Sequence, residues 1–107
     1  MLGAVNLPAA LVDELPAAVR ERLHTCCFEP DGPEARELSA RFGAHVVTYR
    51  REHPPAPPGG VELCRSIAMA DLSPDELAAL GEVEERVGAT LVAYARPVRV
   101  LRSPGTR

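Results

Sequence analysis

The hydrophobic pattern of the chain contains one stretch that occurs twice. Residues 41–49 and 86–94 share Arg, Gly, Ala, Val and Tyr at equivalent positions, which indicates an internal repeat. After the shared glycine, Gly43 or Gly88, the residues predict a β-strand, whose period of two gives it two different faces. One face then carries Ala44, Val46, Thr48, Ala89, Leu91 and Ala93, and the other carries His45, Val47, Tyr49, Thr90, Val92 and Tyr94.

A helix is predicted before each of these strands. Each begins with a proline, Pro33 or Pro74, which suits the first helical position because the missing N–H would have no helical partner there. Ser73 and Glu76 have the spacing of a capping box, in which each side chain hydrogen-bonds the other residue's backbone N–H. Apolar residues at helical spacing are Ala35, Leu38 and Phe42 in one helix and Leu77, Leu80, Val83 and Val87 in the other, and each helix ends at the shared glycine.

A third matching element precedes each helix when the two prolines are aligned. Residues 23–28 then correspond to residues 64–69, with Phe28 against Met69. We interpret both segments as strands, although Ala and Met in the second copy also suit a helix. Each half becomes a βαβ unit, and two such units predict a ferredoxin-like βαββαβ sandwich, an α+β fold with a four-stranded antiparallel sheet and both helices on one face.

The length of 107 residues fits a single domain. Its predicted parts are a helical N-terminal extension (1–22) broken at Pro16, a first βαβ repeat (23–53), a Pro/Gly loop (54–60), a second repeat (61–101) and a tail (102–107). The fold leaves one sheet face bare. We expect either the extension or a short strand at 98–101 to cover that face, or a second copy of the chain to pack on it.

Composition and charge limit the partners and the compartment that we expect for this protein. The formal net charge of -3 and the pI near 5.6 disfavour nucleic acid, because the protein's field repels polyanions. The apolar start of the chain is interrupted by Asn6 and Pro8 and lacks a basic segment, so we expect neither a signal peptide nor a membrane span. Three cysteines without an even framework favour a reducing compartment, and we expect a cytoplasmic protein without a cofactor.

The candidate ligand-binding residues are His45, Tyr49, Tyr94 and Cys27. They fall on the bare face, where two tyrosines at equivalent positions can wall a shallow trough for a small molecule and His45 can act as acid or base. The simpler interpretation is that the tyrosines pack against another subunit or the N-terminal helix. No P-loop, dinucleotide fingerprint, zinc motif or nucleophile elbow occurs, and we assign no catalytic residue.

His24, Cys26 and Cys27 form the densest group of possible metal ligands. On a strand, His24 and Cys26 share a face and Cys27 points away, so we expect no metal site and treat the three only as weak candidates. The two copies of the repeat differ at positions where only one carries a chemically reactive side chain. These positions are His45 against Thr90 and Cys26-Cys27 against Ile67-Ala68, and we expect any function to lie in that asymmetry.

Three functions remain open. The first is a binding or regulatory module that forms a homo-oligomer through its sheet face. The second is a small dimeric enzyme that uses the Tyr/His trough. The third is a thiol or soft-metal site at Cys26 and Cys27.

Overall fold

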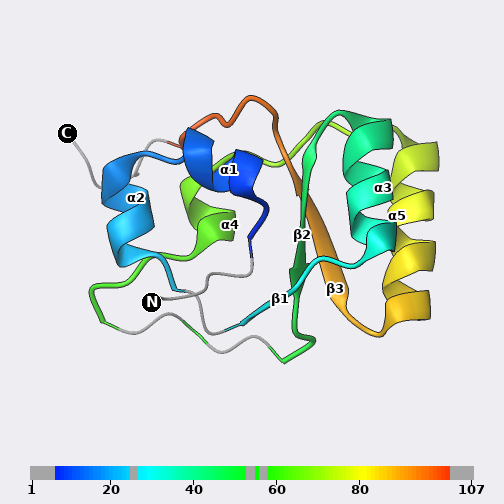
Figure 1. Cartoon of the computed structure of the whole chain (residues 1–107), viewed down its shortest axis with the longest axis horizontal. Coiled ribbons are helices and arrows are strands. Elements are labelled where there is room, and N and C mark those ends of the chain that lie inside the picture. Colours follow the sequence, from blue (N-terminus) through cyan, green and yellow to red (C-terminus); the bar gives the residue numbers. More distant parts are fainter. Residues whose placement is uncertain (1–6, 25–26, 53–54, 56–57, 102–107) are drawn as a thin grey trace.

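The computed structural model describes residues 7–24, 27–52, 55 and 58–101. Figure 1 shows three layers, with a sheet between two groups of helices. One helical layer holds α1 (Ala9–Glu14), α2 (Ala17–Arg22) and α4 (Leu63–Ser66); the sheet holds β1 (Phe28–Glu29), β2 (His45–Tyr49) and β3 (Thr90–Tyr94); the other helical layer holds α3 (Pro33–Phe42) and α5 (Pro74–Val87). In the part of the chain described, no helix is long and apolar enough to cross a membrane.

The prediction of a four-stranded ferredoxin-like sheet is wrong. Over the described residues, the sheet has three strands in the order β1-β2-β3, and both pairs are antiparallel. A βαβ unit has parallel strands, but here the short strand before α3 pairs antiparallel with the strand after it. β1 has only two residues and ends before Pro30, which has no N–H to continue the ladder.

The segment predicted as the third strand begins as a helix instead. Local hydrogen bonds favour the turn of α4, since the Ser66 hydroxyl donates to the Glu62 carbonyl at 2.8 Å and Arg65 pairs with the Glu62 carboxylate at 3.1 Å. After this turn the chain extends, and Met69 forms an isolated antiparallel bridge with Tyr94. The second copy therefore keeps only the end of the predicted strand.

The repeated helix–glycine–strand pattern is confirmed. Both helices begin at their proline, and α5 has the predicted capping box, with Ser73 and Glu76 bonded in both directions at 2.8 and 3.1 Å. Gly43 and Gly88 end the helices with φ of 62° and 72°, a left-handed conformation that disfavours other residues. The strand after each glycine starts within two residues of its predicted position.

The two copies are related by a local pseudo-two-fold axis. In the register of β2 and β3, His45 pairs with Tyr94, Val47 with Val92 and Tyr49 with Thr90. Tyr94, the partner of His45, is the repeat equivalent of Tyr49, and His45 and Tyr49 lie equally far from Val47. The pairing is therefore symmetric about the Val47–Val92 pair, and the axis passes through that pair. The outer partners agree with it, because Phe28 pairs with Tyr49 as Met69 does with Tyr94.

The two sheet faces bury two separate cores. The face with Val46 and Leu91 packs against α3 and α5, as the small residues on that face predict. The face with Val47 and Tyr94 packs against Leu11 of α1, Leu63 of α4 and neighbouring residues. The described part of the N-terminal extension, residues 7–22, therefore is helical, is interrupted at Pro16, and covers the face predicted to be bare. Residues 54, 56 and 57 of the Pro/Gly loop and all of the tail from residue 102 lie outside the described residues.

Candidate functional site

The predicted trough is a packed core. Tyr49 and Tyr94 are 3% and 0% exposed, and their hydroxyl groups hydrogen-bond to each other. Since the two tyrosines are repeat mates, this bond lies where the pseudo-two-fold axis leaves the sheet. Burial raises the pKa of both phenols well above 10, and for Tyr94 the neighbouring Tyr49 adds to the effect. Both phenols stay neutral near pH 7, and neither reaches solvent.

His45 joins the sheet to the N-terminal helix. Its ring is 2% exposed, and Nε2 lies 3.0 Å from Oε1 of Glu14 in α1. The same carboxylate oxygen accepts a 2.8 Å hydrogen bond from the Val98 N–H. These two bonds, the His45 contact first, hold the pKa of Glu14 below its ordinary value. The ring nitrogen that would exchange a proton with a substrate thus contacts Glu14 of α1 instead.

The weak metal candidates do not assemble in the described chain. Cys27 is buried beside the tyrosines, with Sγ 3.6 Å from Nε2 of His24, and Cys26 lies outside the described residues. Over the residues that are described, no group of three His, Cys, Asp or Glu side chains is placed to hold a metal ion.

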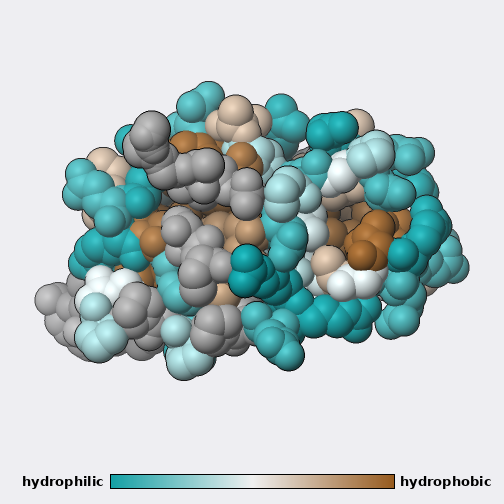
Figure 2. Space-filling model, turned by 60° about the horizontal axis from the view of Figure 1, so that its bottom comes forward, coloured by the Kyte–Doolittle hydropathy of each residue, from teal (hydrophilic) through white to brown (hydrophobic). Residues whose placement is uncertain are grey.

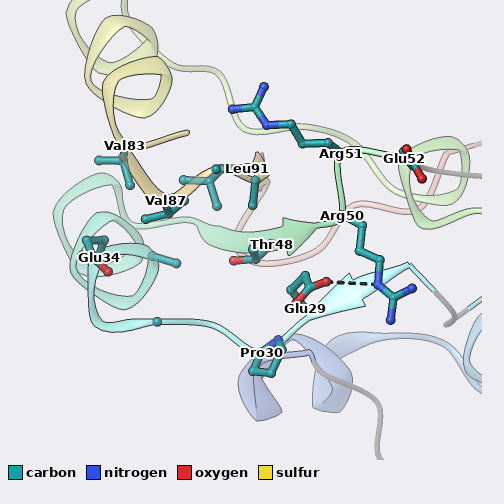
Figure 3. Close-up of a pocket in the computed structure, with 14 residues that line it drawn as sticks. Glu29, Pro30, Glu34, Thr48, Arg50, Arg51, Glu52, Val83, Val87 and Leu91 are labelled. Atoms are coloured by element: carbon teal, nitrogen blue, oxygen red, sulfur yellow. Dashed lines mark hydrogen bonds and ion pairs between the residues drawn. The ribbon is translucent and has the colours of Figure 1, made fainter. Parts of the chain in front are cut away.

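A different site opens on the opposite side of the sheet. It is a groove of about 1000 Å³ where α3 begins, α5 ends and the strands β1 and β2 reach Pro30 and Arg50. Figure 3 shows side chains from these elements turned toward one space. Ala35, Val83, Val87 and Leu91 make its apolar part, and Figure 2 shows a hydrophobic patch enclosed by hydrophilic residues on the α3–α5 side of the molecule.

Charged side chains surround the apolar part. Arg50 pairs with Glu29 at 3.0 Å, with both side chains partly exposed to water (Figure 3). Arg51 donates to the Glu84 carbonyl near the C-terminal end of α5, where helix carbonyls carry partial negative charge. Glu34 and Glu52 complete the rim. With three glutamates and two arginines, the rim has a net charge of -1.

A half-buried carboxyl group lies beside the groove. The Thr48 hydroxyl, which lines the groove, donates to Oδ1 of Asp31 at 2.9 Å. Burial raises the pKa of Asp31 above its ordinary value, and the Thr48 hydrogen bond opposes that shift. The charged form of Asp31 therefore bears a desolvation cost, which Thr48 and the nearby charge of Arg36 oppose.

The same position in the second copy is filled by the chain itself. Leu72 replaces Asp31 when the helix prolines are aligned, and Phe42 replaces Val87 when the glycines are aligned. Leu72 and Phe42 are partly buried and pack against the core between the sheet and the helices. Val87, by contrast, is 40% exposed in the groove. The asymmetry that opens this site is thus at positions 31 and 87 rather than at His45 or Cys27.

Sequence reasoning missed the groove residues. Arg50, Arg51 and Glu29 lie at strand ends that share no motif, and only the fold brings them to the helix ends. The mismatch of Asp31 with Leu72 was visible in the aligned copies and signals a polar gap in one of them.

The fold and the groove define a small three-layer α+β domain with an internal two-fold repeat and a charged groove with an apolar floor. Comparison of the chain with protein-family models, with curated proteins and with solved structures gives no significant match.

Proposed function

We propose that this protein is a small non-enzymatic binding module that holds its ligand in the groove between α3, α5 and the ends of β1 and β2. The observation that carries the proposal is the groove itself, because apolar Val87 remains exposed there while the repeat-related position is filled. Its volume is at the upper end of the range of protein ligand sites. An apolar floor with a few polar groups around it is also the usual composition of such sites.

The side chains of the groove support binding rather than catalysis. Among the described residues that line it, none is His, Cys or Ser, and the only hydroxyl belongs to Thr48. That hydroxyl is engaged with Asp31, and Thr48 is 6% exposed. The arginines hold Glu29 and the end of α5, so the groups that remain suit electrostatic selection of a ligand.

Self-association through the β-sheet stays a prediction, but it loses the surface on which it rested. Helices α1, α2 and α4 cover that face, and Tyr94 and Val47 are fully buried under them. The enzyme hypothesis loses its trough for the same reason. The groove is therefore the surface that a binding function would use.

The test is a fragment screen by amide NMR on the ¹⁵N-labelled full chain. A set of small apolar and charged fragments is expected to shift the amides of Val83, Val87 and Leu91. Val87→Phe should abolish those shifts, because it places in the groove the residue that fills the related position. Leu77→Phe is the matched control, since Leu77 is 55% exposed on the same helix and does not line the groove. Shifts that occur elsewhere, that survive Val87→Phe, or that never occur would contradict the proposal.

A further inference from the structure

We infer that the ligand of this groove is an extended peptide segment with an aliphatic side chain next to basic residues. This inference rests on the proposed function and names the chemical class of its ligand. It follows from two independent features. The first is the side chain that fills the related position in the second repeat, and the second is the charge that surrounds the groove.

The second repeat indicates the shape of the ligand. There, Leu72 lies just before the first turn of α5 and covers the apolar layer between helices and sheet. In the first repeat, the corresponding Asp31 bonds Thr48, and Thr48 itself replaces Ala93. The same kind of apolar layer is therefore left without its aliphatic cover. A leucine-sized side chain that enters from outside would restore the packing found in the other half, where Leu72 lies in a non-helical segment directly before Ser73, whose backbone is extended.

The charges of the groove indicate the neighbours of that side chain. Arg50 is neutralised by Glu29, and Arg51 points to the carbonyl end of α5 (Figure 3). Glu34 and Glu52 remain on the rim, and the chain as a whole has a net charge of -3. Basic residues on either side of the aliphatic one would meet these carboxylates, and the overall charge would speed their approach.

The composition of this protein allows a direct test of the contact. All twelve of its basic side chains are arginine and none is lysine. A carbodiimide that joins carboxylates to amines will therefore link a lysine-containing peptide to the protein, with no lysine amine in the protein itself to compete. The probe is the acetylated and amidated peptide Gly-Lys-Leu-Lys-Gly. Its controls are Gly-Lys-Ser-Lys-Gly, without the aliphatic side chain, and Gly-Glu-Leu-Glu-Gly, with reversed charge.

The lysine–leucine peptide is expected to shift the amides of Val83, Val87 and Leu91 and to crosslink at Glu34 or Glu52. Replacement of its leucine by serine should weaken binding by about tenfold or more, because about 1.4 kcal/mol of apolar burial corresponds to tenfold in affinity. Charge reversal should weaken binding at low salt, and the difference should shrink in 0.5 M salt because exposed charges are then screened.

Protein variants separate the two parts of the inference. Val87→Phe should abolish binding of the lysine–leucine peptide, and Leu77→Phe should leave it unchanged. The double substitution Glu34→Gln with Glu52→Gln should abolish the preference for the lysine peptide over the glutamate peptide, while both still bind more tightly than the serine peptide. Thermal unfolding of each variant verifies that it is folded.

Several results would overturn the inference. If fragments bind the groove but no peptide does, the ligand class is wrong and the proposed function stands. If neither fragments nor peptides bind, both fail. Stronger binding of the glutamate peptide, or crosslinks that persist in Val87→Phe, would show that charge or location was assigned wrongly. A dimer in sedimentation that Val87→Phe dissociates would make a second copy of this chain the occupant, against the inference.

Discussion

The hydrogen bond between Tyr49 and Tyr94 offers the sharpest test of the pseudo-symmetric core. Tyr49→Phe keeps the ring and its contact with Phe28, whose ring centre lies 5.1 Å away, and removes one oxygen atom. The Tyr94 hydroxyl then loses its partner inside a core where Tyr94 is 0% exposed. Because a buried polar group without a partner keeps its full desolvation cost, we expect a loss of about 1–3 kcal/mol in the free energy of unfolding.

The double variant separates the hydrogen bond from the rest of the core. Tyr49→Phe with Tyr94→Phe removes both hydroxyl groups and leaves two rings of nearly unchanged shape. Since replacing both partners by apolar groups can be nearly neutral, the double variant should be more stable than the sum of the single losses predicts, by about 1–2 kcal/mol.

The assay is urea unfolding at one pH, followed by circular dichroism, with thermal unfolding as a second measurement. The four proteins compared are the wild type, Tyr49→Phe, Tyr94→Phe and the double variant. For a domain of this size, each 1 kcal/mol should lower Tm by about 4–8 °C. Strict additivity of the two substitutions would refute a direct hydroxyl pair. A single variant as stable as the wild type would refute the burial of that pair.

Further predictions concern the helix ends and the titrating groups. Gly81 lies inside α5 with open space around its position, so Gly81→Ala should stabilise the fold by about 0.5–1 kcal/mol. Gly88 has a φ of 72°, so Gly88→Ala should destabilise the fold by about 1 kcal/mol. The urea midpoints of the two variants must therefore move in opposite directions. Ser73→Ala removes half of the capping box and should cost about 1 kcal/mol in the same assay, while an unchanged midpoint would contradict a role for that cap. The pKa of Glu14 is lowered by folding, so its contribution to stability is present above the ordinary 4.5 and is lost as the pH falls; Glu14→Gln should lower the urea midpoint near neutral pH, and the difference from wild type should shrink below pH 4.5. Burial raises the pKa of both tyrosines, the only two in the chain, so stability should fall as the pH rises above 10, and phenolate absorbance should appear together with unfolding rather than before it.

Sequence alone was sufficient wherever local chemistry decides the structure. The prolines at 33 and 74 mark the starts of α3 and α5, and the glycines at 43 and 88 mark their ends. Each of these residues acts through its own backbone, so its effect can be read without knowledge of distant contacts. The alternation after each glycine likewise separated the face that packs on α3 and α5 from the face with the tyrosines.

Strand pairing could not be read in this way. The aligned segments 23–28 and 64–69 suggested two full strands, but local hydrogen bonds at Glu62 form a helical turn in the second, and β1 keeps two residues. Whether a short apolar segment pairs, and with which neighbour, depends on residues far along the chain, such as Tyr94 for Met69.

The composition of each face was determined by the sequence, but its surroundings were decided by the tertiary structure. His45, Tyr49 and Tyr94 do share a face, yet α1 and α4 bury it and turn the expected trough into a core. The groove on the other side joins the beginning of α3 to the end of α5, two segments about 50 residues apart in the chain. Alternation reports which residues point the same way, whereas exposure depends on what packs above them, and that is a property of the whole folded chain.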